Sequence, residues 1–423
     1  MEASVMELPV SFVAPQGRTL PSASVQRAPR GQRGSLASST GYAFHAIVAS
    51  GACGACARGK RSRARRATKA VGLEEPVEVS PAKVEALKKL IKNALEVRKQ
   101  PQQLETFLRV VQASGYNLLD LDKDDWREIG GDLHPFLLPL ATKGSFDDDL
   151  EVLGLLIRAP NGKELSPDEW QVVRQKPRKS KVVELLADDV GRYIVKRAEE
   201  ANFQKKKQDL QIIEATKDVY DVRFKGEDQT ALDKWLLLEV GAFPDVYKHL
   251  AMEHINNDDA MTGLVIADTM RETFGYTWAF PHAYVSTLLN TFFDGKKETE
   301  DRTIEGNHVA QQCFTAGYPL WTLEDDSEET LNRLISYAQM PQLGSIASLR
   351  VFYLKRSTDD QRSAVRTGRV SEGCVALAKG QALMDAVICG HKSYNGIRQE
   401  LCDIYEEVPG CDPLCNLIQY FKQ

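Results

Sequence analysis

The stretch KSKVVELLADDVGRYIVKRAEEANFQKKKQDLQIIEATKD, residues 179–218, decides how the chain is divided into structural parts. It contains no proline and a single glycine, Gly191. Apolar residues recur every three or four positions, which is typical of one face of an amphipathic helix. The pattern lapses at KKKQ (205–208) and returns at Ile212. We therefore predict a long connecting helix, or two abutting helices, over residues 179–222.

Helical patterns occur on both sides of this connector. Ser80 and Pro81 can begin a helix, and a second helix runs from Leu104 to about Ala113. Further helices are expected near residues 230–240, 244–255, 258–273, 281–293, 303–315, 328–339, 343–355, 371–389, 393–407 and 412–421. Only VYDVRF (219–224) and LRVFYL (349–354) are strand candidates.

These patterns predict a mainly α, multi-helical globular protein. Two helical units are joined by the long helix, with an N-terminal helical domain over 81–178 and a C-terminal helical domain over 223–423. No run of about 18 apolar residues occurs, so we expect a soluble chain with no transmembrane segment.

The distribution of charge divides the chain at a different place from the predicted helical units. Residues 1–73 contain 11 Lys and Arg and two Glu, which gives 11 − 2 = +9. The remainder carries (54 − 11) − (59 − 2) = 43 − 57 = −14. A basic head therefore precedes an acidic body, and an acidic body disfavours general binding to polyanions.

The basic head has the composition of an organelle leader. It is rich in Ser, Ala, Gly, Pro and Arg and has no acidic residue between Leu8 and Leu73. Such a segment buries too little apolar surface to fold alone, and acid-poor leaders of this kind are typical of transit peptides. We predict a disordered transit peptide over residues 1–70 and a linker over 71–80.

A short motif indicates which organelle. Phe12-Val13-Ala14-Pro15, followed by an Arg-, Ser- and Pro-rich stretch, resembles the transit-peptide motif of dinoflagellate plastid precursors. The resemblance implies import into a plastid. No second apolar stretch follows Arg66, so the stroma is favoured over the thylakoid lumen. The mitochondrial matrix is the alternative destination.

Cysteines gather near the end of the chain. Cys411 and Cys415 are the most plausible local pair, and Cys402 is within reach. These three are candidates for redox or disulfide chemistry, whereas inert buried thiols are the more common state of such residues. A zinc site would need a fourth ligand, so no metal site is predicted.

The densest aromatic stretch is FGYTWAFPHAYVSTLLNTFF, residues 274–293. An apolar-ligand pocket here would use Trp278 and His282. Core packing is the alternative, because aromatic side chains dominate core energetics.

Catalytic motifs are missing from the sequence. Phosphate-binding loops, nucleophile elbows and dinucleotide fingerprints do not occur, so no catalytic residue or cofactor is predicted and a non-enzymatic role is favoured. We expect a plastid protein that acts by macromolecular interaction, as an auxiliary or assembly factor of a plastid complex, with other proteins as partners. One alternative is RNA binding through basic clusters such as RQKPRKSK (174–181), and another is a thiol/redox role. The patterns indicate no oligomeric state.

Overall fold

A computed structural model describes the body of the chain. It covers residues 78–97, 99–121, 129, 132–144, 149–158, 167–292, 300–357 and 372–421. The transit peptide predicted for residues 1–70 and most of the predicted linker lie outside these ranges. Within them, every helix is too short or too polar to cross a bilayer.

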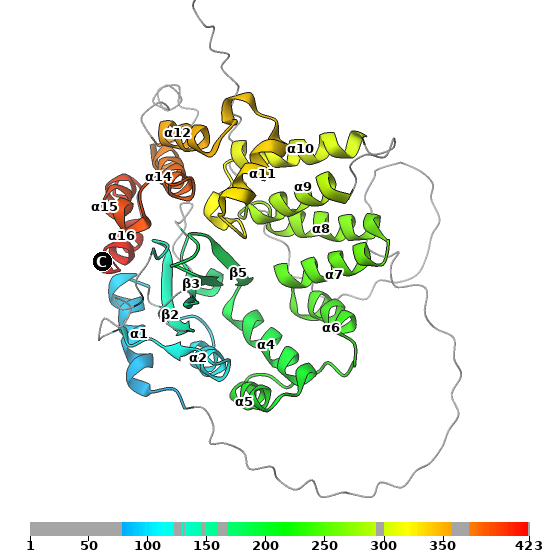
Figure 1. Cartoon of the computed structure of the whole chain (residues 1–423). Helices are drawn as coiled ribbons and strands as arrows, with labels where there is room; N and C mark the ends of the chain where they lie inside the picture. The colour runs from blue at the N-terminus through cyan, green and yellow to red at the C-terminus, as the bar shows by residue number, and fades with distance from the viewer. Residues whose placement is uncertain are drawn as a thin grey trace, which may run out of the picture. The chain divides into compact units, whose positions relative to one another are not determined.

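An antiparallel sheet accompanies the helices (Figure 1). Its five strands lie in sequence order, so each strand pairs with the next along the chain. The strands are β1 Asn117–Leu118, β2 Leu137–Lys143, β3 Glu151–Leu156, β4 Gln171–Gln175 and β5 Val183–Ala187. The prediction of a mainly α protein is correct, but the segment 81–178 contains four of these strands and is not a purely helical domain.

Close packing of β2 against β3 requires a glycine. The register shifts between Pro139 and Ala141, where β2 bulges. A Cβ at Gly154 on β3 would lie 2.2 Å from the backbone oxygen of Leu138. Only glycine permits this approach of the two backbones.

The predicted long helix over 179–222 is wrong in its first part. Residues Val183–Ala187 form β5, and the helix begins only after Asp189, whose carboxylate accepts a hydrogen bond from the Arg192 backbone N–H at 2.8 Å. Lys205 adopts a left-handed conformation (φ 53°) that ends this helix, and a second helix follows. The break at KKKQ therefore separates two helices, which was the alternative reading of the pattern.

The first group of helices comprises α1 Pro81–Ala94, α2 Leu104–Ala113, α4 Val190–Gln204, α5 Lys207–Thr216 and α6 Gln229–Trp235. In this group, α2 and α4 contact the sheet, and α5 packs on both of them. A π-helical turn, Leu236–Val240, continues α6 and ends at Gly241.

The second group confirms the helical pattern of the C-terminal half. It comprises α7 Pro244–Asn256, α8 Ala260–Phe274, α9 Phe280–Phe292, α10 Glu300–Thr315, α11 Glu328–Ala338, α12 Ile346–Arg356, α14 Glu372–Ile388, α15 Tyr394–Tyr405 and α16 Asp412–Tyr420. Each begins within three residues of its predicted start.

Neither strand candidate forms a strand. Residues 349–354 lie in α12. Residues 219–224 are irregular, and the buried carboxylate of Glu199 accepts hydrogen bonds from the backbone N–H groups of Arg223 (2.6 Å) and Phe224 (3.1 Å). A side chain thus pairs the backbone groups that a neighbouring strand would otherwise pair.

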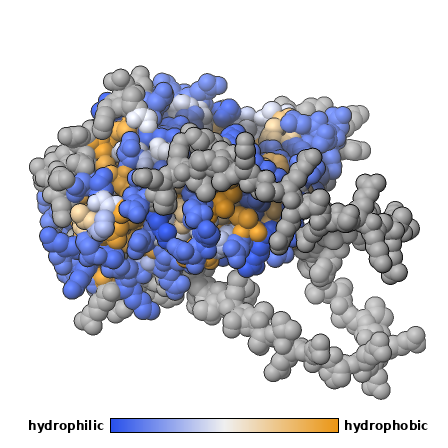
Figure 2. All heavy atoms as spheres, turned by 90° about the horizontal axis from the view of Figure 1, so that it is seen from below, coloured by the Kyte–Doolittle hydropathy of each residue, from blue (hydrophilic) through white to orange (hydrophobic). Residues whose placement is uncertain are grey.

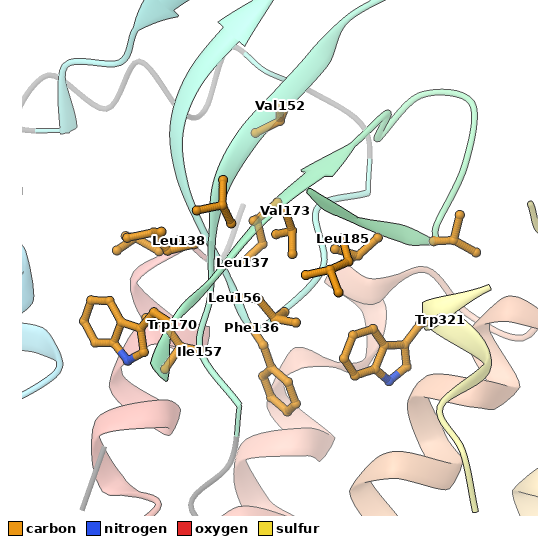
Figure 3. Packing of buried hydrophobic residues seen from close by; sticks show 14 of the residues in the cluster. Phe136, Leu137, Leu138, Val152, Leu156, Ile157, Trp170, Val173, Leu185 and Trp321 are labelled. Atoms are coloured by element: carbon orange, nitrogen blue, oxygen red, sulfur yellow. The ribbon is translucent and has the colours of Figure 1, made fainter. Parts of the chain in front are cut away.

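The core lies where the sheet meets the C-terminal helices. Phe136, which precedes β2, and Trp321 contribute large rings to it, with ring centroids 6.4 Å apart (Figure 3). Tyr405 of α15 packs against Phe136 at 5.8 Å. Residues far apart in the sequence therefore share one core.

Candidate protein-interaction surface

Helices α7 to α11 form a series in which each helix packs on the next (Figure 1). We call residues 244–338 the α7–α11 region. A small core of its own fills the space between α7, α8, α9 and α10. Its members are Ala251, Ile255, Leu264, Ala267, Val285, Leu288, Leu289 and Val309.

A close contact in this series joins α7 and α8. A Cβ at Gly263 would lie 2.7 Å from the backbone oxygen of Ala251 and 2.6 Å from Cγ1 of Ile255. Glycine at this position allows the two helices to approach each other. Asp259 caps α8 by accepting a hydrogen bond from the Thr262 backbone N–H at 3.1 Å.

A buried hydrogen bond from the Leu320 backbone fixes this region to the C-terminal helices. The carboxylate of Asp385, on α14, accepts a hydrogen bond from the Leu320 backbone N–H at 2.7 Å and one from Gln381 at 3.0 Å. Burial raises the pKa of Asp385 to about 7. The turn Leu320–Thr322, between α10 and α11, is therefore anchored from outside the region.

Aromatic contacts fix the same turn to the sheet. The ring of Trp321 lies 4.2 Å from that of His134, which is fully buried. The Arg158 guanidinium lies over the rings of Trp278 (4.8 Å) and Trp321 (5.4 Å). Burial lowers the pKa of His134 far below its ordinary value, with further contributions from Arg398 and Arg158, so this imidazole is neutral. The α7–α11 region is thus held on a fixed support.

The outer face of α8 carries apolar side chains. Met261 and Val265, one helical turn apart, are 49% and 55% exposed, and Tyr276, just beyond the helix, is 74% exposed. Asp258 and Glu272, next to this row, are exposed as well. Together these side chains offer a small apolar row with charged residues beside it.

The same region carries most of the negative charge of the body. It contains 16 acidic and 6 basic residues, hence 6 − 16 = −10 of the −14 carried by residues 74–423. The acidic residues are Asp245, Glu253, Asp258, Asp259, Asp268, Glu272, Asp294, Glu298, Glu300, Asp301, Glu305, Glu324, Asp325, Asp326, Glu328 and Glu329.

Internal ion pairs occupy several of its basic residues. Arg271 pairs with Asp268 (2.6 Å), and Arg302 pairs with Glu305 (2.9 Å). Lys248 pairs with Glu324. Each pair neutralises one carboxylate and one cation, so the net charge of −10 is carried by the carboxylates that remain.

The face of the body seen in Figure 2 is mainly hydrophilic. Its hydrophobic atoms form several small groups rather than one continuous patch.

Comparison with known proteins points to the same region. Residues 244–341 match the family model described as the PAB middle domain. This match begins at the first residue of α7 and ends three residues beyond α11. The description names neither a ligand nor a partner. No curated protein and no solved structure matches the chain.

The predicted ligand-pocket residues lie in the packed interior of this PAB-middle match. Trp278 is fully buried and packs against Phe280 and Trp321. His282 stacks on Tyr318 at 4.2 Å and donates a hydrogen bond through Nε2 to the Gly275 backbone oxygen at 2.9 Å. Burial lowers the pKa of His282 to about 4. Both side chains serve as packing elements here.

The three candidate redox cysteines are buried at the other end of the described chain. Cys402 is on α15, Cys415 is on α16, and Cys411 precedes α16. Hydrogen bonds join Cys402 to Cys415 rather than Cys411 to Cys415.

The basic cluster at 174–181 has internal partners. Arg174 pairs with Glu184 (2.7 Å), Lys176 with Glu151 (3.2 Å) and Lys179 with Asp149 (2.6 Å). Lys181 donates to the Val387 backbone oxygen at 3.0 Å. These contacts reduce the charge that the cluster can offer to a phosphate backbone.

Sequence reasoning did not single out the α7–α11 region. The sequence predicts its helices, but the net charge of the whole body does not distinguish it. The excess of acidic residues over 244–338 is the sequence signal that does. The sequence does not predict the exposure of Met261 and Val265, because apolar residues at helical spacing indicate a buried helix face.

Proposed function

We propose that this chain is a plastid-imported factor that acts by binding another protein, as an auxiliary or assembly factor of a plastid complex. The α7–α11 region would be its binding surface. The observation that carries the proposal is the coincidence, in one region, of a net charge of −10, exposed apolar side chains on α8 and the PAB-middle match.

Charge specifies the chemistry of the partner. A surface with this surplus of carboxylates attracts a basic protein and repels a polyanion such as RNA. Met261, Val265 and Tyr276 supply apolar contact area, which gives affinity beyond charge attraction.

Affinity purification of the tagged full chain from isolated plastids tests the proposed function. We expect a basic protein to co-purify, to survive ribonuclease treatment and to be released as salt is raised. Recovery that ribonuclease abolishes would instead establish RNA as the partner.

Localisation is tested separately. Residues 1–73 fused to a fluorescent protein should direct it to the plastid stroma. Accumulation in the mitochondrial matrix would support the alternative destination, and a cytosolic signal would contradict both.

A further inference from the structure

The thiols of Cys402 and Cys415 face each other between α15 and α16. Cys402 Sγ donates to the Cys415 backbone oxygen at 3.8 Å, and Cys415 Sγ donates to the Cys402 backbone oxygen, also at 3.8 Å. Both residues are buried, at 0% and 5% exposure. The reciprocal bonds bring each sulfur next to the backbone of the other residue.

The two thiols differ in the direction in which their pKa is shifted. The hydrogen bond with Cys415 lowers the pKa of Cys402 and raises that of Cys415. A thiolate is the reactive form of cysteine, so the reaction that we propose below begins at Cys402, and Cys415 is the resolving thiol. Cys411 is a weaker competitor, because burial raises its pKa to about 11.

The surroundings hold the pair in place. On α15, Arg398 donates to the Ile418 backbone oxygen of α16 at 3.1 Å and to the Leu133 backbone oxygen at 3.0 Å. Arg398 thus fixes the far end of α16, and the thiol pair lies near its beginning. A covalent bond between the thiols would join two helices that already pack together.

We propose that Cys402 and Cys415 form an oxidative modification site at which hydrogen peroxide produces a reversible disulfide between α15 and α16. This inference goes beyond the proposed function and does not depend on it. Burial selects a small oxidant, because the disulfide of another protein cannot reach enclosed sulfur atoms.

The reaction balances in two steps. The Cys402 thiolate attacks one oxygen of hydrogen peroxide, the O–O bond breaks, and after protonation a sulfenic acid and one water are formed. The Cys415 sulfur then attacks the sulfenic sulfur, the S–O bond breaks, and the departing hydroxide takes up the Cys415 proton as a second water. Two thiols are oxidised by two electrons in total, and one peroxide is reduced to two waters.

Peptide mapping of the peroxide-treated full chain tests this inference. Trypsin leaves all three cysteines in one peptide, 399–422, so cleavage on the amino side of Asp403 and Asp412 is needed to separate them. We expect a Cys402–Cys415 cross-link to be the main product between α15 and α16, the thiols of these two residues to be lost, and dithiothreitol to restore both.

Single substitutions provide the controls. Cys402→Ser and Cys415→Ala should each abolish the cross-link, whereas Cys313→Ser, in the buried interior of α10, should leave it unchanged. Circular dichroism would verify that each variant is folded. A main cross-link that includes Cys411, or full alkylation of Cys402 and Cys415 in denaturant after peroxide treatment, would overturn the inference.

Discussion

The backbone N–H of Leu320 donates a 2.7 Å hydrogen bond to the buried carboxylate of Asp385. This bond links the turn between α10 and α11 to α14, on the C-terminal side of the core. The turn also carries Trp321, which packs on His134 before β2. The α7–α11 region is therefore fixed to both the helical and the sheet parts of the body.

Asp385→Ala should destabilise the fold by about 1–3 kcal/mol, because the buried N–H of Leu320 loses its acceptor. Asp385→Asn retains an acceptor oxygen and should cost less. Denaturant titration followed by circular dichroism measures both. Equal losses for the two variants would show that the hydrogen bond is not the source of the effect.

Asp385 should also make stability pH-dependent. Its pKa is raised to about 7 in the folded chain, so the folded state holds a proton that the unfolded state releases at lower pH. Its contribution is fully present below about pH 4 and is lost as pH rises towards about 7. The difference in unfolding free energy between wild type and Asp385→Asn, measured across this range, should shrink as pH rises. A constant difference would contradict the raised pKa.

His134 should act with the opposite sign. Its pKa is depressed by burial, so the unfolded chain binds a proton below about pH 6.5 while the folded chain does not. Stability from this group is present above that pH and is lost as pH falls. His134→Asn keeps an acceptor for the Phe136 backbone N–H and should remove this acid sensitivity in urea titrations. If the unfolding free energy of His134→Asn falls with decreasing pH as steeply as that of the wild type, His134 is not the source of the acid sensitivity.

Gly263→Ala should separate α7 from α8 and destabilise the fold by about 1–3 kcal/mol. The added methyl would meet the Ala251 backbone oxygen and Ile255. Gly373→Ala on α14 is the matched control, since its methyl would have no neighbour closer than 3.8 Å and alanine favours a helix. Thermal unfolding of both variants distinguishes steric overlap of the added methyl group from the higher helix propensity of alanine. An unchanged melting temperature for Gly263→Ala would show that the methyl group causes no overlap.

Much of the helical part of the fold is predictable from sequence, whereas the sheet is not. The helices of the C-terminal half have clear caps, such as Ser327 for α11 and Ser345 for α12. The strands lack the alternating pattern of a half-exposed sheet, because β2 and β3 are buried on both faces. In β5, Val183 and Leu186 have a spacing that suits a helix equally well, so only pairing with β4 decides the outcome.

The candidate surface was predictable only in part. Its charge can be read from the sequence, but exposure at Val265 depends on which side of α8 packs against α7 and α9. The pairing of Cys402 with Cys415 likewise depends on how α15 and α16 cross. Both features depend on how helices that are separate in the sequence pack together, which the spacing of residues within one helix does not determine.

Val265→Glu should weaken partner binding by about tenfold or more, equivalent to about 1.4 kcal/mol, because it places a charge in the apolar row of α8. Val351→Glu on α12 is the matched control, since Val351 is 51% exposed and Val265 is 55% exposed. The control should bind as the wild type does. An equal loss of affinity in Val265→Glu and Val351→Glu would show that the binding surface is not specifically on α8.

Zero-length carbodiimide cross-linking of the captured complex, which joins carboxylates to lysine amines in direct contact, tests the central claim most directly. The account predicts that the partner's lysines are joined to carboxylates of the α7–α11 region, with Asp258 and Glu272 among them. Cross-links confined to carboxylates elsewhere, such as Glu400 and Asp403 on α15, would contradict it.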